Sequence, residues 1–231
     1  MKELYKGKVK TIFQTEFPDK VLIRYEDKVT CGNGERETYI SEKGQINCEI
    51  SAILFEKLHR AGIKTHYIDR PEPNLMLCRK VWILPLEVVV RNIATGSIVR
   101  ETTIREGTRF PQELIEFYLK DDSKNDPLLT PDRIKLMHYD TEIIQEMSSQ
   151  VNAVLKKIFE EIDIDLVDFK LEYGYTSKGE IILADEISPD GCRLWKKGSV
   201  NSMDKDLYRK NTGNIIEAYQ EILFKLRELK S

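Results

Sequence analysis

The first eighty residues carry short apolar runs broken by turn residues, a pattern typical of β-strands. Pro18 and Asp19 mark a turn between two of these runs, so the two runs are expected to form a hairpin. A second pair of runs flanks the turn-forming segment 71–73. The predicted strands are residues 9–13, 21–25, 66–68 and 75–78.

Helical spacing of apolar residues appears elsewhere in the chain. Between the two pairs of strands, apolar residues recur every three or four positions over 46–58, and Gly62 favours a helix end soon after. A long apolar stripe that includes Ile143 predicts a second helix, and the end of the chain repeats the pattern. The further predicted helices are residues 112–120, 141–161 and 214–229.

A change of pattern near residue 80 divides the chain. The β-branched run 86–90 predicts a buried strand, but predicted helices dominate after it. We therefore expect an α+β fold with a smaller strand-rich lobe, residues 1–80, and a larger α+β lobe, residues 81–231. A cleft between two lobes is a common place for a ligand.

The most informative segment is 166–173, which alternates strictly between apolar and charged residues. Because successive side chains of a strand point to opposite faces, Asp168, Lys170 and Glu172 are expected to share one face. A second strand follows after a segment of turn composition. Centring the turn on residues 177–178 places Lys170 opposite Asp185. Opposed residues share a face, so this register predicts a surface crowded with charged side chains.

The same register places Glu172 opposite Leu183, close to Asp185. Two carboxylates on neighbouring strands, Glu172 and Asp185, could then hold Mg²⁺ between themselves and nucleotide phosphates. Magnesium is commonly bound by one or two carboxylates, with phosphate oxygens and water completing the site. The alternative is an ordinary solvated face with a Lys–Asp pair between the strands.

A polar loop follows directly after this acidic strand. It places Ser188, Asp190 and Arg193 beside the predicted metal site. The planar guanidinium of arginine suits two-point contact with phosphate or carboxylate. The alternative is a turn closed by an Asp–Arg pair.

Two further segments have residues suited to anions. Arg91 ends an apolar run, and Gly96 before Ser97 would let the backbone approach a phosphate or a sugar hydroxyl. Lys8 and Lys10 share a face of the first predicted strand, where two ammonium groups can neutralise a triphosphate. The alternatives are a common Gly–Ser turn and a solvated strand edge that hinders aggregation.

Composition narrows the class of protein. Among the 231 residues, Lys+Arg 36 against Asp+Glu 39 gives a net charge of -3, which argues against a nucleic acid as the main partner. A hydrophobic content of 41% with only 12 Gly excludes collagen-like and largely disordered chains. No run reaches the roughly 18 apolar residues of a membrane helix, and no N-terminal secretion signal is visible.

The cysteines and histidines show no spacing of a metal site. The four cysteines stand far apart without a CxxC pair, so we expect free thiols and a cytoplasmic location. His59, His66 and His138 are expected to be structural.

Taken together, these segments resemble the phosphoribosylaminoimidazole-succinocarboxamide synthases, also called SAICAR synthetases, in their bacterial short form. The match runs nearly from end to end, and the shared order and spacing of the motifs make it specific. Cys31 departs from the family pattern, because members often carry Ala there, so no role in closing over substrate is assigned to the segment 31–36. The matching segments are residues 5–10, 42–47, 85–97, 120–127, 166–174, 185–195 and 203–209.

The resemblance implies an ATP-dependent carbon–nitrogen ligase of purine biosynthesis with a two-lobed α+β fold related to ATP-grasp enzymes. It would join L-aspartate to the carboxylate of 5-amino-1-(5-phosphoribosyl)imidazole-4-carboxylate (CAIR), giving SAICAR, ADP and phosphate. A carboxylate is a poor acyl donor, so an acyl phosphate made from ATP is the expected intermediate. Phosphoryl transfer needs charge neutralisation and positioning more than a protein nucleophile. The resemblance also implies Mg²⁺ as cofactor and a homodimer.

Site residues follow from the resemblance and from the residue patterns. Asp168 and Lys170 are expected to take part in catalysis, and no segment points to the aspartate pocket. Expected ATP-binding residues are Lys8, Lys10, Lys80, Glu172 and Asp185, the last two also holding Mg²⁺. Expected substrate-binding residues are Arg91, Ser97, Lys120, Asp122, Asp190 and Arg193.

Two other functions remain open from the sequence. A small-molecule kinase would use the same Mg²⁺–ATP site but would need no amine substrate. A nucleotide-binding sensor would bind ATP without forming ADP.

Overall fold

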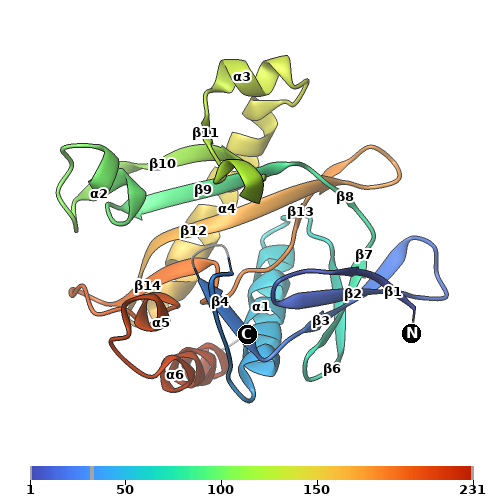
Figure 1. Ribbon diagram of the computed structural model, residues 1–231, viewed down its shortest axis with the longest axis horizontal. Helices are drawn as coiled ribbons and strands as arrows, with labels where there is room; N and C mark the ends of the chain where they lie inside the picture. Colours follow the sequence, from blue (N-terminus) through green and yellow to red (C-terminus); the bar gives the residue numbers. More distant parts are fainter. Residues whose placement is uncertain (1, 32–33, 230–231) are drawn as a thin grey trace.

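A computed structural model describes residues 2–31 and 34–229. The chain forms two large antiparallel sheets, and the strands β1–β3 lie below β9, β10 and β12 in Figure 1. The two predicted pairs of N-terminal strands are confirmed, and they join a further edge strand in the first sheet. In spatial order this sheet consists of β1 (Glu3–Lys6), β2 (Lys10–Gln14), β3 (Lys20–Tyr25), β7 (Leu75–Arg79) and β6 (Tyr67–Glu72).

The second sheet is organised around one long strand, β12 (Ile164–Tyr175), which contains the predicted alternating segment. This strand has neighbours along both edges and carries the charged face described below. The main path of the sheet is β11 (Leu128–Leu129), β10 (Arg109–Leu119), β9 (Leu86–Ile93), β12 and β13 (Ile181–Ala184). The other strands that pair with β12 are β8 (Trp82–Ile83) and β14 (Cys192–Lys196). A separate hairpin is formed by β4 (Lys28–Cys31) and β5 (Arg36–Tyr39).

Three long helices confirm the predicted helical periodicity, and Asp140 and Asn214 cap two of them with side-chain oxygens that accept backbone N–H bonds. The long helices are α1 (Lys43–Arg60), α4 (Thr141–Glu161) and α6 (Ile215–Glu228). The short ones are α2 (Ser97–Glu101), η1 (Asp122–Lys124), α3 (Pro131–Leu136) and α5 (Asp206–Lys210). In the described part of the chain, no helix combines the length and apolar character needed to cross a membrane.

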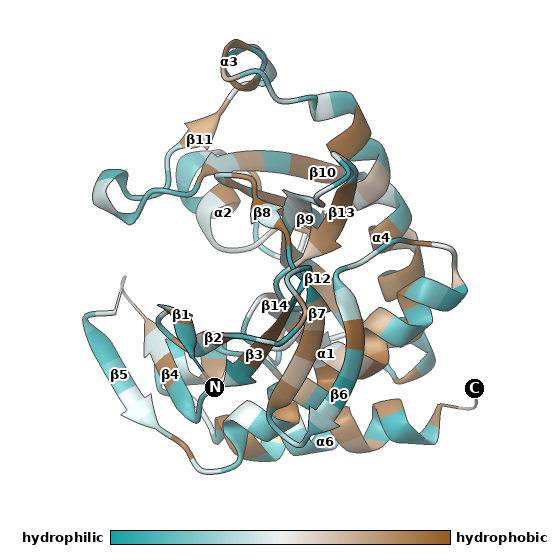
Figure 2. Cartoon of the chain, turned by 90° about the vertical axis from the view of Figure 1, so that its right-hand side faces the viewer, coloured by the Kyte–Doolittle hydropathy of each residue, from teal (hydrophilic) through white to brown (hydrophobic). Residues whose placement is uncertain are grey.

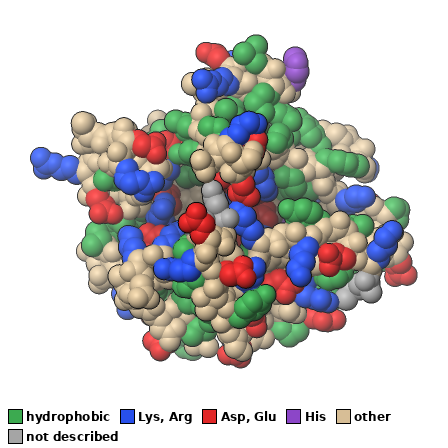
Figure 3. Space-filling view, in the orientation of Figure 1, with side chains coloured by type: hydrophobic (Ala, Val, Ile, Leu, Met, Phe, Trp, Pro, Cys, Tyr) green, Lys and Arg blue, Asp and Glu red, His purple; other side chains and the backbone are tan. Residues whose placement is uncertain are grey.

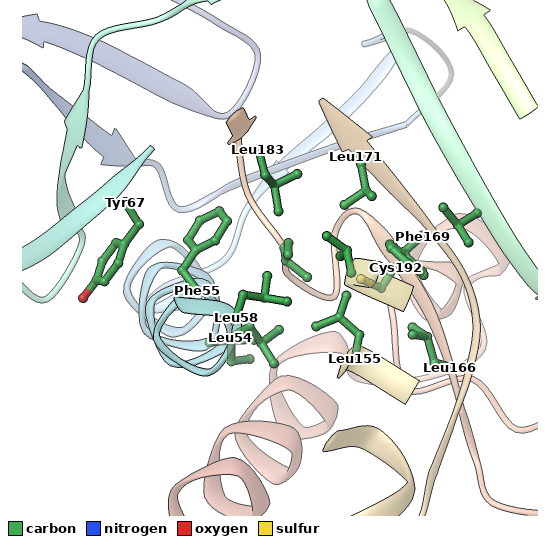
Figure 4. Close-up of a cluster of buried hydrophobic side chains, with 14 of the residues drawn as sticks. Leu54, Phe55, Leu58, Tyr67, Leu155, Leu166, Phe169, Leu171, Leu183 and Cys192 are labelled. Atoms are coloured by element: carbon green, nitrogen blue, oxygen red, sulfur yellow. The ribbon is translucent and has the colours of Figure 1, made fainter. Parts of the chain in front are cut away.

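Helix α1 lies at the centre of the apolar core. It packs against β3, β6 and β7 of the first sheet and against α4 and α6. Its buried residues Leu54, Phe55 and Leu58 belong to the same buried cluster as Leu155 of α4 and Leu171 of β12 (Figure 4). Figure 2 shows apolar residues on strands such as β12 and β13 and also on the helices, whereas β5 is polar. The core is therefore continuous between the two sheets, while the boundary between residues 1–80 and 81–231 stays a prediction.

Two predictions of local structure are wrong. Residues 112–120 form most of strand β10 instead of a helix, because this segment pairs with β9 on one side and with β11 on the other. Long-range pairing outweighs the local spacing here. In α4, Ile143 is 45% exposed and Ile144 is buried, so the apolar stripe begins one position later than expected.

The predicted register of the β12–β13 hairpin is wrong by one residue. Glu172 pairs with Ala184 and not with Leu183. The turn is a three-residue loop closed by a bond from the Thr176 N–H to the Glu180 carbonyl at 2.9 Å, with Gly179 at a φ of 76°. A three-residue hairpin loop commonly ends on such a left-handed residue, and it shifts the register relative to a two-residue turn.

The two sheets are joined by main-chain bonds. Thr65 forms a parallel bridge with Leu183, the last residue but one of β13. The His66 N–H donates to the Leu183 carbonyl at 2.8 Å, and the Leu183 N–H donates to the Lys64 carbonyl at 3.1 Å. These bonds fix the start of β6 against the end of β13.

Candidate active site

A cleft of about 450 Å³ lies between the two sheets, and acidic and basic side chains gather around the hollow in Figure 3. This size is within the range of small-molecule sites. Thr30 and Cys31 contribute to its wall from the first half of the chain, and Lys205 and Arg209 from the end. Predicted site residues that line the cleft are Lys8, Arg91, Ser97, Asp122, Asp168, Lys170, Asp190 and Arg193.

Asp168 is the centre of the first charged cluster. In the sheet, β9 places Arg91 opposite Asp168, and β14 places Arg193 opposite it on the other edge. Both arginines donate to Oδ2 of Asp168, at 2.8 Å each. The sheet order thus brings together three residues that are far apart in sequence, as the predicted shared site requires.

The two arginines differ in what they can offer to a ligand. The Arg91 side chain is 3% exposed, and it also donates to Glu116 at 2.7 Å and to Ser97 at 2.8 Å. Arg193 is 22% exposed and so presents more of its surface to the cleft. A Cβ at Gly96 would lie 3.0 Å from two Arg193 nitrogens, so the glycine, at a φ of +69°, makes room for this guanidinium.

A second cluster contains lysines and carboxylates beside the first. Lys120 and Lys170 both bind the buried Glu172 carboxylate, the latter at 2.7 Å, and Lys10 binds Asp185. Lys170 also donates to Glu87 at 2.9 Å, and Lys10 lies 2.9 Å from Glu186. The predicted ATP-binding residues Lys10, Glu172 and Asp185 therefore lie in one neighbourhood with Lys120 and Lys170.

Ionisation in this cluster is governed by burial and by the opposite charges. Burial disfavours the ammonium form of Lys170, but Glu172, Asp185 and Glu87 outweigh it and raise its pKa well above the usual value. Burial likewise opposes the charge of Asp185, while Lys10 and Lys170 hold its pKa far below the usual value. Lys170 is thus a permanent cation at neutral pH, suited to binding phosphate and unsuited to accepting a proton.

The donor set fits a magnesium ion that is shared with a nucleotide. Within the residues that the structure describes, no three His, Cys, Asp or Glu side chains group into a complete metal site. Glu172 and Asp185 instead supply two carboxylates, which is the number that Mg²⁺ takes when phosphate oxygens and water complete its shell. Their assignment as Mg²⁺ ligands remains a prediction.

Other predicted residues have more varied surroundings. Lys8 pairs with Asp122 at 2.7 Å across the mouth of the cleft, where both side chains are exposed. Asp190 is buried, with one oxygen bound to Lys43 and the other accepting from the Tyr219 hydroxyl at 2.7 Å. The other predicted site residues are not among those that line the cleft, so their roles stay predictions: Lys10, Lys80, Lys120, Glu172 and Asp185. The segment 31–36, to which the sequence assigns no role, includes residues 32 and 33, which lie outside the described residues.

The sequence and the fold resemble those of known proteins. A family model described as SAICAR synthetase matches residues 3–226. The chain belongs to the SAICAR synthetase family. A phosphoribosylaminoimidazole-succinocarboxamide synthase from Prochlorococcus marinus is 48% identical over 230 residues, covering 96% of this chain and 95% of that protein.

Two solved structures agree with this assignment. The synthase from Ehrlichia chaffeensis has a TM-score of 0.95 at 40% identity, with all of both chains covered. A SAICAR synthetase in complex with ADP has a TM-score of 0.94 at 37% identity, covering 98% of each chain. The predicted SAICAR-synthetase fold and ligase class are thus confirmed, and the relation to ATP-grasp enzymes stays a prediction.

Several residues of this SAICAR synthetase site were not assigned a role from the sequence. Glu87, Lys205 and Arg209 line the cleft, and Lys43 is a buried partner of Asp190. All four residues lie in segments that match the family, so the resemblance marked them without giving any of them an individual function. Glu87 ends up beside Lys170 only because β9 and β12 are neighbours, which no local pattern reveals.

Asp204 gives a pH-dependent prediction for this enzyme. Burial raises its pKa to about 7, although its carboxylate accepts backbone N–H bonds from Leu194 and Asp206. A raised carboxyl pKa means that the folded state holds the proton more tightly. Its contribution to stability is therefore complete below about pH 4 and is lost as the pH rises through about 7.

Between pH 4 and pH 8 we expect the wild-type protein to lose on the order of 3–4 kcal/mol relative to the Asp204→Asn variant. Urea unfolding of both proteins across this range measures the difference. Parallel pH profiles would show that Asp204 is already ionised in the folded protein at low pH.

Proposed function

We propose that the cleft joins L-aspartate to CAIR through an acyl phosphate, with Mg²⁺–ATP bound at the lysine–carboxylate cluster. The observation that carries this proposal is that two clusters of paired cations and carboxylates lie next to each other on β12, one with lysines and one with arginines. One contains three ammonium groups, of Lys10, Lys120 and Lys170, suited to a triphosphate. The other presents Arg193 beside Asp168, suited to the phosphate or carboxylate of CAIR.

The reaction follows from this arrangement. A carboxylate oxygen of CAIR attacks the γ-phosphorus of ATP, the bond to ADP breaks, and an acyl phosphate forms. The amine of L-aspartate then attacks the acyl carbon, the carbon–nitrogen bond forms, and phosphate leaves as the amine loses a proton. Neither step requires a protein nucleophile, so the work of the chain is positioning and charge neutralisation.

The lysines exchange partners when the nucleotide binds. Lys120 and Lys170 neutralise Glu172, and Lys10 neutralises Asp185. Nucleotide phosphates would take over these ammonium groups and leave Glu172 and Asp185 to hold Mg²⁺. The ion would supply further neutralisation of phosphate charge. The lysines would thus occupy two roles, as counter-ions without nucleotide and as phosphate ligands with it.

The substrate side depends on the arginine cluster. Arg91 is bound to Asp168, Glu116 and Ser97, so it orients these groups and offers CAIR only its small exposed edge. Arg193 would make the main contact with CAIR. A homodimer in the cytoplasm, with no nucleic acid or membrane partner, completes the proposal.

An assay with CAIR, Mg²⁺–ATP and L-aspartate tests the reaction. We expect ADP, phosphate and SAICAR in equal amounts and only when all three substrates are present. CAIR labelled with ¹⁸O in its carboxylate should transfer one labelled oxygen to phosphate, because that oxygen bridges carbon and phosphorus in the acyl phosphate.

The other functions give different results in the same assay. ADP formation from CAIR that ignores aspartate would support a kinase. ATP binding without ADP formation would support a sensor. Unlabelled phosphate together with normal SAICAR formation would keep the ligase but exclude the acyl phosphate.

A further inference from the structure

Asp185 has a backbone conformation that its surroundings must maintain. Its φ is 62°, in the left-handed region that costs a non-glycine residue roughly 1–2 kcal/mol. Such conformations persist where neighbouring groups over-determine them, and they are frequent at functional sites. Asp185 lies directly after β13, where it leaves the sheet towards Lys10.

His66 bonds to the two backbone carbonyls that flank Ala184. Its main-chain N–H donates to the Leu183 carbonyl at 2.8 Å, and its ring Nε2 lies 2.9 Å from the Asp185 carbonyl oxygen. A carbonyl oxygen only accepts, so Nε2 carries the hydrogen in this contact. Farther along, the Ser51 hydroxyl accepts from the Ile187 N–H at 3.1 Å.

The His66 ring itself is buried beside an aromatic ring. The residue is 3% exposed, and the edge-on ring of Phe55 lies 5.5 Å from it at an interplanar angle of 72°. Cys78 Sγ lies 3.7 Å from Nε2 on another side. Water therefore has little access to replace the bond to Asp185.

We propose that His66 is a positioning residue that holds the main chain of Asp185, so that the carboxylate faces Lys10 and the cation that accompanies ATP. This inference rests on the proposed role of Asp185. Lys10 restrains the side chain of Asp185 and His66 restrains its backbone, so the two contacts act on different bonds of the same residue. The structural role expected for His66 from the sequence is thus extended to the nucleotide site.

Four variants separate positioning from packing. His66→Leu removes the donor, whereas His66→Gln keeps an N–H near the position of Nε2. Phe55→Leu is the packing control, because Phe55 in α1 contacts the His66 ring but makes no hydrogen bond to Asp185. Asp185→Asn reports on the metal site itself. Calorimetry measures the affinity for ADP with and without Mg²⁺, and steady-state kinetics give KM for Mg²⁺–ATP and for CAIR.

For His66→Leu we expect Mg²⁺-dependent ADP binding about tenfold weaker, the size of one lost hydrogen bond, with the KM for CAIR unchanged within about twofold. His66→Gln should retain affinity within about threefold. Phe55→Leu should lower the melting temperature while leaving the ADP affinity unchanged. If His66→Leu does not fold, His66→Asn replaces it, since its shorter amide cannot reach the Asp185 carbonyl.

Combining His66→Leu with Asp185→Asn completes the test. If His66 acts through Asp185, the double variant should bind Mg²⁺–ADP no more weakly than Asp185→Asn alone. Wild-type affinity in both His66→Leu and His66→Asn, or equal losses for His66→Leu and Phe55→Leu, would overturn the inference. Unchanged affinity in Asp185→Asn would instead overturn the proposed metal site.

Discussion

Replacing Glu172 with Gln is expected to lower kcat for SAICAR formation by at least about 100-fold, the scale on which a single preorganised electrostatic contact acts. Glu172 is buried and accepts from both Lys120 and Lys170. The amide removes the negative charge that would hold Mg²⁺, and it points N–H groups at one of these ammonium groups. Steady-state kinetics under saturating CAIR and aspartate measure the loss.

Glu180→Gln is the matched control for this change. Glu180 lies at the end of the loop in the same hairpin but pairs on the surface with Lys64, so its substitution should leave kcat within about twofold. Circular dichroism establishes that both variants are folded. Near wild-type rates for Glu172→Gln and for Asp185→Asn would show that the two carboxylates do not hold the metal.

Asp168→Asn is expected to destabilise the fold by about 3–5 kcal/mol, the usual cost of removing one partner from a buried ion pair. Its Oδ2 accepts from Arg91 and Arg193, both at 2.8 Å, so the substitution leaves two guanidinium groups without their shared counter-charge. Arg193 keeps only its pair with Asp206 at 3.4 Å, so its orientation should change and the KM for CAIR should rise. Urea unfolding and CAIR titration of the rate measure the two effects.

Asp165→Asn is the control on the same strand. Asp165 pairs with Arg109, whose side chain is 61% exposed, and accepts from the Gly198 N–H, a bond that the amide oxygen of Asn can keep. Losing the pair with Arg109 should therefore cost less than about 1 kcal/mol. Equal destabilisation in the two variants would mean that the buried arginine pair contributes no special stability. An unchanged KM for CAIR in Asp168→Asn would place the CAIR site away from Arg193.

Strict alternation allowed the charged face of β12 to be predicted, because a period of two depends only on local geometry. Asp168, Lys170 and Glu172 do lie on the side that faces the site. The hairpin register depended on the loop conformation around Gly179, which composition does not define. The turn residues were therefore recognised, but the predicted partner of Glu172, Leu183, is one residue away from the observed partner, Ala184.

Strand order was the larger obstacle. Arg91 and Arg193 meet at Asp168 because β9 and β14 pair with opposite edges of β12. The pattern of residues along one sequence does not reveal this order of strands. The buried pair of Lys43 and Asp190 joins the start of α1 to a distant loop for the same reason. The charged residues were thus chosen as functional candidates by type, and their functional roles stay predictions, while their partners required the fold.

The central position of α1 has a consequence for protein synthesis. This helix completes its packing against α6, which comes from the opposite end of the chain. During translation, the first sheet and α1 leave the ribosome long before α6 exists. The emerging chain must therefore keep the apolar face of α1, including Leu54 and Leu58, covered in some other way until the last helix is made. Chaperones that bind exposed apolar segments would be needed most during this interval.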